Sequence, residues 1–402
     1  MKNLINIPKN DMNKYAYDIL NNKIKYVMVQ DDKIDTSSVC VTVKTGSIQE
    51  PKEYQGLAHF LEHMLFLGSK KFPKENHFDD RLKKCGGHSN AWTADFETVY
   101  YFTVQTEYLE EMVSIFSRFF IDPLFDPDSV DREMNAVDSE HNKNINNDWW
   151  RIYRMLNLIS KKDSLINKFG TGNLETLNKK CLRDRMIKFY NDFYCSENIS
   201  VAIISSINLE KQDKIMKKYF GEIKHKKPKK FIINQPFYHK NNKSYHIQSV
   251  SKMKTMIFLW EIPTFHNDIE YKSWHIITDF INDNGLESLE SFLKSKGLIE
   301  DLFIFPRNHG IFMLAVDLLK NNKKYRQDVS NYINYYIKTL LDQNWEKISK
   351  YFQKNTELIY HNNPRMNPLG LIQNLANNCH YYDMEDVRSW SLIKKIDGNR
   401  IK

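Results

Sequence analysis

The stretch that decides the fold spans residues 56–68 and reads GLAHFLEHMLFLG. It has no proline or β-branched residue between its two glycines, so it predicts one short helix. At about 100° per residue, His59, Glu62 and His63 share one narrow face of that helix. Most of the apolar residues cover the opposite side, which we expect to be buried. Phe66 is the exception, because it falls on the histidine face.

The three titratable residues of this helix have the spacing of a metal site. Two histidines one turn apart can bind one metal ion in a tetrahedral arrangement, and the carboxylate between them can take a proton from a metal-bound water. The order His59-x-x-Glu62-His63 is the reverse of the commoner His-Glu-x-x-His helix and is typical of the inverzincin metallopeptidases. Taken alone, these five positions leave open a chance trio of side chains on a solvated face.

Length and composition are those of a packed globular protein. The chain has 402 residues, 41% of them hydrophobic, which suffices for two or three domains. The net charge of +8 is modest and mostly spread out, so we expect no nucleic-acid partner. Five scattered cysteines without a Cys-x-x-Cys pair argue against a disulfide framework. The sequence has neither an apolar leader nor a membrane-spanning run, so we expect a cytoplasmic protein without a membrane partner.

Strand signals appear on both sides of the helix. Residues 24–29 and 38–44 are rich in β-prone side chains and predict two paired strands. Residues 88–93 and 98–104 predict a hairpin around Asp95.

The lysine-rich stretch 225–240 predicts a linker. It would separate a first domain at 1–224 from a second at 241–402. The second half restarts the scheme of the first with strands, one of them expected at 245–250, and then a helix. It lacks a full copy of the histidine motif, so we expect a metal-free domain of similar fold.

Two histidines leave a catalytic zinc ion one protein ligand short. A long helix predicted from Asp128 onward supplies four candidates, namely Glu133, Asp138, Glu140 and His141. The two glutamates are seven residues apart and therefore share one face. Spacing alone does not decide among the four.

The region around this long helix resembles the insulinase (M16) family of zinc metallopeptidases, in its insulin-degrading-enzyme branch. The resemblance rests on the motif at 59–63, on residues 131–141 (DREMNAVDSEH), and on two shorter matches, FPKEN at 72–76 and FGTGN at 169–173. It runs almost without gaps over residues 46–173 and continues more weakly in the second half.

This resemblance implies a zinc site with one Zn²⁺ per chain. In the family a glutamate about 75 residues after the histidine motif binds zinc, which makes Glu140 the third ligand beside His59 and His63. Glu133 matches a second family glutamate, which orients one of the ligands. Glu62 would be the general base that takes a proton from the attacking water.

The resemblance also implies a substrate-binding surface. Asn90, Ala91 and Trp92 match the edge strand on which family members bind an extended substrate as an added strand. Phe66, Trp92 and Trp150 match positions that line the pocket beside the scissile bond. The alternative is that these aromatic residues belong to the core.

The fold implied is α+β, with two similar domains that each hold a mixed or antiparallel sheet covered by helices, as in insulinases and processing peptidases. The expected function is that of a zinc-dependent metalloendopeptidase that hydrolyses short or unstructured peptides. Insulin-degrading enzymes have four such domains, closed as two half-shells, so a homodimer or a partner half-subunit would complete this chain. The alternative is a catalytically weak half-subunit that binds zinc and peptide and needs a partner half.

Overall fold

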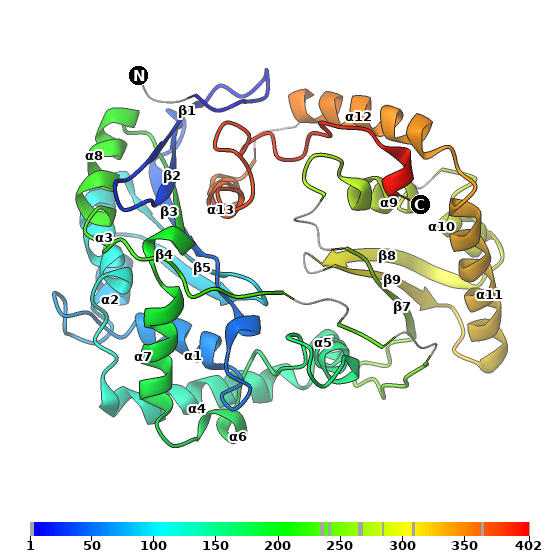
Figure 1. Ribbon diagram of the computed structural model, residues 1–402, viewed down its shortest axis with the longest axis horizontal. Helices are drawn as coiled ribbons and strands as arrows, with labels where there is room; N and C mark the ends of the chain where they lie inside the picture. Colours follow the sequence, from blue (N-terminus) through cyan, green and yellow to red (C-terminus); the bar gives the residue numbers. More distant parts are fainter. Residues whose placement is uncertain are drawn as a thin grey trace. The chain divides into compact units, whose positions relative to one another are not determined.

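The computed structural model describes residues 4–233, 237–239, 243–263, 268–283, 285–307, 310–362 and 366–401. Within these residues the chain forms two units, each with a sheet, helices and a hydrophobic core (Figure 1). The first unit consists of Met1–Ile145, Tyr153–Phe237 and Pro364–Trp390. The second consists of Asn146–Ile152, Tyr238–Asn363 and Ser391–Lys402.

The predicted division of the chain at a linker stays a prediction, and residues 234–236 and 240 of the linker stretch lie outside the described residues. Two segments of the chain do not follow the predicted division. Asn146–Ile152 group with the second unit, and Pro364–Trp390 group with the first.

The first unit contains a mixed six-stranded sheet within the described residues. In spatial order its strands are β1 (Lys14–Ile19), β2 (Lys25–Gln30), β6 (Ile199–Ser205), β3 (Thr36–Val43), β5 (Thr98–Gln105) and β4 (His88–Thr93). The predicted hairpin is confirmed as β4 and β5, which pair antiparallel. The expectation that residues 24–29 pair with residues 38–44 is wrong, because β6 lies between β2 and β3. Every residue of β6 is buried, which favours a central position for this strand.

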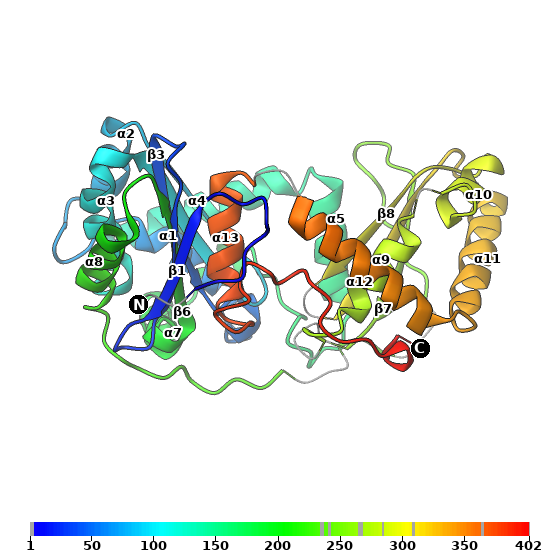
Figure 2. The same cartoon turned by 90° about the horizontal axis from the view of Figure 1, so that it is seen from above.

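Helices cover both faces of this sheet (Figure 1, Figure 2). One face shares its core with α1 (Leu57–Leu65), α2 (His77–Lys84), α3 (Leu109–Phe116), α4 (Pro127–Asn144), α6 (Leu174–Leu177), α7 (Leu182–Phe193) and α8 (Leu209–Phe220). The other face is covered by α13 (Pro368–Asn378), although α13 follows the strands of the second unit in the sequence. α5 (Asp148–Ile159) begins in the second unit and continues in the first.

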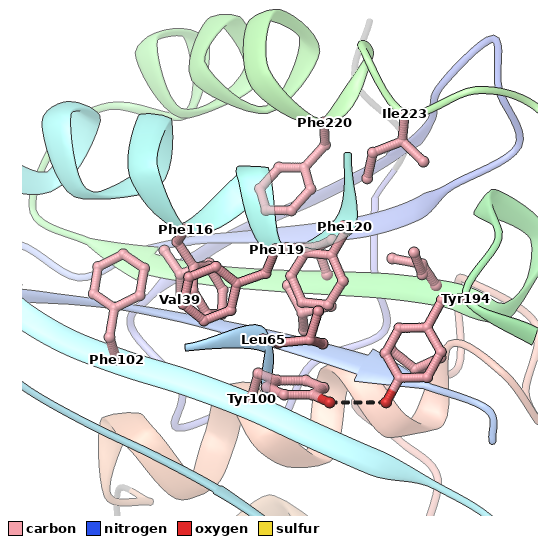
Figure 3. Close-up of a cluster of buried hydrophobic side chains, with 14 of the residues drawn as sticks. Val39, Leu65, Tyr100, Phe102, Phe116, Phe119, Phe120, Tyr194, Phe220 and Ile223 are labelled. Carbon is pink, nitrogen blue, oxygen red and sulfur yellow. Dashed lines mark hydrogen bonds between the residues drawn. The ribbon is translucent and has the colours of Figure 1, made fainter. Parts of the chain in front are cut away.

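Aromatic rings fill much of the core between the sheet and the first group of helices (Figure 3). Phe116, at the end of α3, packs edge to face against Phe120 with ring centroids 5.7 Å apart. The hydroxyls of Tyr100 and Tyr194 are buried there and satisfy each other at 2.8 Å. These two hydroxyls are therefore paired, as burial requires.

The second unit has a three-stranded antiparallel sheet within the described residues. Its strands, in spatial order, are β7 (Thr255–Glu261), β9 (Ile311–Leu318) and β8 (Ile299–Arg307). Its helices are α9 (Ser273–Ile281), α10 (Leu289–Ser295), α11 (Lys323–Leu340) and α12 (Trp345–Asn362). None of the described helices of either unit has the length and apolar content needed to cross a membrane.

The strand expected at residues 245–250 is not formed, and this is a correction. The backbone N–H groups of Val250 and Ser251 donate to the carboxylate of Asp148, at 2.9 Å each. Donors that bond to a side chain in this way are lost to strand pairing.

We expect Leu375→Ala to lower the free energy of unfolding of the first unit by about 2–5 kcal/mol, the usual effect of truncating a fully buried leucine. Leu375 belongs to α13 and packs on the sheet of the first unit. Hydrogen exchange should show weaker protection in β2, β3 and β6, with β8 and β9 unchanged. Leu358→Ala on α12 is the control, because Leu358 is 63% exposed. Lost protection in the second unit instead would contradict the assignment of α13.

Candidate metal centre

The helix α1 forms as its apolar pattern predicts. It begins after Gly56, whose φ of 88° lies in the left-handed region that glycine favours. Its fully buried residues are Leu57, Ala58, Phe60, Leu61, Met64 and Leu65. The remaining face presents His59, Glu62 and His63 together.

Glu140, on α4, completes a group of three potential metal ligands. The two Nε2 atoms of His59 and His63 are 3.3 Å apart, and Oε2 of Glu140 lies 3.5 Å from the first and 3.7 Å from the second. Ligand atoms at about 2.0–2.1 Å from a tetrahedral zinc ion lie roughly 3.3–3.4 Å from one another. Two imidazole nitrogens and one carboxylate oxygen at these separations therefore fit zinc. Among the described residues, no other cluster of this kind is found.

The second nitrogen of each imidazole also has a partner. Nδ1 of His59 lies 2.8 Å from the carbonyl oxygen of Thr171, and Nδ1 of His63 lies 3.5 Å from Oε2 of Glu133. In a neutral imidazole, an N–H at Nδ1 that donates to such an acceptor leaves Nε2 unprotonated and able to bind a metal. The sequence analysis did not identify Thr171, although it lies in the matched FGTGN run, because Thr171 acts through its backbone carbonyl.

The other two candidates on α4 are engaged elsewhere. Asp138 accepts a hydrogen bond at 3.0 Å from the first N–H of α6. The ring of His141 packs edge to face on Phe169, with centroids 4.9 Å apart. The geometry thus distinguishes Glu140, which lies beside both histidines, from Asp138 and His141. Spacing alone did not make this distinction.

Glu62 lies beside the ligand group and is only 7% exposed. Its Oε2 accepts a hydrogen bond at 2.6 Å from the hydroxyl of Thr93, at the end of β4. Burial raises the pKa of Glu62 above its ordinary value, although the charge on His59 and the Thr93 hydrogen bond oppose the change. A buried carboxylate with a raised pKa is typical of general bases. Thr93 is a second site residue that the sequence analysis did not identify.

Interactions among the side chains of the site shift two pKa values in the metal-free protein. Burial opposes protonation of His63, but hydrogen bonds to Glu133 and Glu140 outweigh it and raise the pKa of His63 to about 9. Hydrogen bonds from His59 and His63 hold the pKa of Glu140 far below its usual range. At neutral pH, His63 is therefore protonated and Glu140 is ionised.

The predicted substrate strand is β4, which lies at an edge of the sheet within the described residues. Asn90 and Trp92 point to the exposed side, while Ala91 packs against the core. The edge position agrees with a strand that can pair with an added peptide.

The other two predicted substrate residues lie in different surroundings. Phe66 caps α1, and its ring packs on Phe78, Tyr100 and Phe119 with centroids 5.0–6.2 Å apart, so its contacts favour the core alternative. Trp150 is exposed on α5, in the segment that groups with the second unit. Their roles in substrate binding stay predictions.

Known families and proteins resemble this chain. Residues 25–162 match the insulinase model of peptidase family M16, and residues 181–351 match the model of the peptidase M16 inactive domain. Insulin-degrading enzyme of Bos taurus is 33% identical over 395 residues, which cover 94% of this chain and 38% of that protein. A Schizosaccharomyces pombe protein named as a zinc protease is 33% identical over 349 residues, 84% of this chain and 36% of that protein.

A solved structure also shares the fold. The crystal structure of pitrilysin superposes with a TM-score of 0.90 at 24% identity and covers 100% of this chain and 44% of that chain. This likeness confirms the predicted α+β fold with two similar domains. The chain spans less than half the length of each of these three proteins.

Zinc binding at about pH 7.5 should release close to one proton, because a histidine must lose its proton before its nitrogen can bind the metal. Since the pKa of His63 is raised to about 9 in the metal-free protein, the apparent zinc affinity should rise with pH and level off above about 9. Calorimetry in two buffers of different ionisation enthalpy would count the protons.

The matched variant for this measurement is Glu133→Gln. Removing one of the carboxylates that raise the pKa of His63 should reduce the number of protons released. Equal proton release from both proteins, or an affinity that falls as pH rises, would contradict the proposal that Glu133 raises the pKa of His63 and that His63 supplies the released proton.

Proposed function

Because the chain belongs to the insulinase family, peptidase family M16, we propose that it is a zinc-dependent endopeptidase with His59, His63 and Glu140 as the ligands of one zinc ion. The observation that carries this proposal is the triangle of ligand atoms beside a buried Glu62. Three protein ligands are typical of catalytic zinc sites, which keep a further position open. When bound, zinc lowers the pKa of a water molecule to about 7 and polarises the substrate carbonyl.

Glu62 is proposed as the general base. It takes the proton of the attacking water and passes it to the leaving amine. The hydroxyl of Thr93 donates to Oε2 at 2.6 Å and so fixes the orientation of the carboxylate. The raised pKa of Glu62 supports this role, since a stronger base accepts a proton more readily.

Two acceptors are proposed to orient the histidines. The carbonyl of Thr171 fixes the ring of His59, and the carboxylate of Glu133 fixes the ring of His63. Loss of an outer partner of this kind usually weakens metal affinity about 10- to 100-fold.

The proposed substrates are short or unstructured peptides. An edge strand offers unpaired backbone N–H and C=O groups, and a peptide without its own secondary structure can pair with them. We propose that the substrate extends along Asn90 and Ala91 of β4. Trp92, whose side chain lies on the exposed side of the same strand, is proposed to contact the side chains of the substrate near the scissile bond. A cytoplasmic location stays a prediction.

We expect Glu62→Gln to retain one zinc ion per chain and to lower kcat at least about 100-fold, because an amide cannot accept the proton. Metal content and cleavage of a quenched-fluorescent peptide would be measured on the same preparation. Glu107→Gln is the matched control, since Glu107 is exposed beyond β5. Unchanged turnover in the Glu62 variant would reject Glu62 as the base.

The purified chain should cleave an unstructured peptide, and a chelator should abolish this cleavage until zinc is added back. Light scattering on the same sample would show whether the active species is a monomer or a homodimer. One bound zinc ion without any cleavage would contradict an endopeptidase that acts without another chain. That result would favour the alternative of a zinc- and peptide-binding half-subunit that needs a partner half.

A further inference from the structure

The first turn of α1 is capped from outside the helix. Gly56 precedes the helix and has no side chain with which to cap it. Instead, the carboxylate of Glu50 accepts hydrogen bonds from the backbone N–H groups of Gly56, at 2.7 Å, and Ala58, at 3.1 Å. Both oxygens of Glu50 are therefore held by donors that the helix itself leaves unsatisfied. A negative charge at this end is also favoured by the helix dipole.

A buried lysine accompanies this buried carboxylate. Glu50 is 3% exposed and Lys168 is 5% exposed. The ammonium group of Lys168 donates to the backbone carbonyls of Ile48 and Glu50, at 2.6 Å each. Burial raises the pKa of Glu50, while the backbone donors and Lys168 lower it. A buried charge without a partner is costly, and the opposite charge of each residue lowers that cost for the other.

Lys168 begins a loop that also touches the start of α1. The N–H of Phe169 donates to the side-chain carbonyl of Gln55 at 2.7 Å. The backbones of Gly56 and Gly172 are in close contact, since a Cβ atom on Gly56 would lie 2.2 Å from Cα of Gly172. The loop at 168–172 thus contacts the segment before α1 at several points.

The same loop supplies the acceptor for a proposed zinc ligand. The carbonyl of Thr171 lies three residues after Lys168 and meets Nδ1 of His59 at 2.8 Å. The distance between this carbonyl and the ring is set by the contacts of the loop with the start of α1. Any loosening of those contacts would let the ring of His59 turn away from its partners.

We propose that Glu50 and Lys168 are positioning residues that lock the loop at 168–172 onto α1 and so orient His59 toward the metal. They touch neither substrate nor metal, and they act through the helix start and the Thr171 carbonyl. This inference rests on the proposed zinc site. It assigns a function to two buried charged residues that the peptidase mechanism does not use.

The test compares metal binding by the purified full chain with that of Lys168→Met. The probes are zinc affinity, measured by competition with a chromophoric chelator, and the visible spectrum of the cobalt(II)-substituted protein. We expect zinc affinity to fall about 10- to 100-fold and the cobalt spectrum to change, because the geometry of the His59 ligand is altered. Lys179→Met is the matched control, since Lys179 is exposed a few residues beyond the loop.

A second variant keeps the test informative if Lys168→Met does not fold. Gln55→Ala removes the bond to the N–H of Phe169 without leaving a buried charge unpaired. We expect Gln55→Ala to weaken zinc binding several-fold and to change the cobalt spectrum in the same direction.

The outcomes separate this inference from the proposed function. Folded variants that bind zinc and cobalt like the wild type, with only a lower unfolding temperature, would overturn the positioning role and leave the zinc site standing. A wild-type chain that binds neither metal would overturn the zinc site and this inference together. Weaker binding with an altered spectrum, in the presence of a normal Lys179 control, would support the positioning role.

Discussion

The candidate metal centre depends on the burial of one face of α1. Burying a large apolar side chain contributes about 1.5–3 kcal/mol, and this short helix buries Leu57, Phe60, Leu61, Met64 and Leu65 completely. Turning the helix by one residue would expose several of them at once. The core therefore sets the rotation of α1 about its axis. This rotation in turn sets the direction of the face that carries His59, Glu62 and His63. The chemistry is fixed by packing before any metal binds.

How much could be predicted from the sequence follows from the range of each interaction. The face of α1 and the β4–β5 hairpin arise from residues close in sequence, so periodicity and turn signals sufficed. The position of β6 between β2 and β3, and the return of α13 to the first unit, join segments far apart in the chain. A local pattern shows that a strand or helix forms, but it does not show against which distant segment that element packs.

The same limit applies within the site. His59 and His63 could be proposed from one helix, because side-chain type and spacing are visible in sequence. Glu140 needed the family resemblance, since four residues on α4 had a suitable ligand atom. Thr171 and Glu50 could not be proposed at all. The first acts through a carbonyl that every residue has, and the second caps a helix from outside it.

Glu50 and Glu62 show how different surroundings give two buried glutamates different roles. Both are buried, and burial raises the pKa of both. Glu50 has each oxygen held by a backbone N–H at the helix start, where the dipole favours its charge. Glu62 stands in the last turn, where the dipole disfavours a negative charge, and one hydroxyl, that of Thr93, holds one of its oxygens. A carboxylate at position 62 can therefore accept a proton beside the candidate ligands, whereas a carboxylate at position 50 has both oxygens engaged at the start of the helix that presents them.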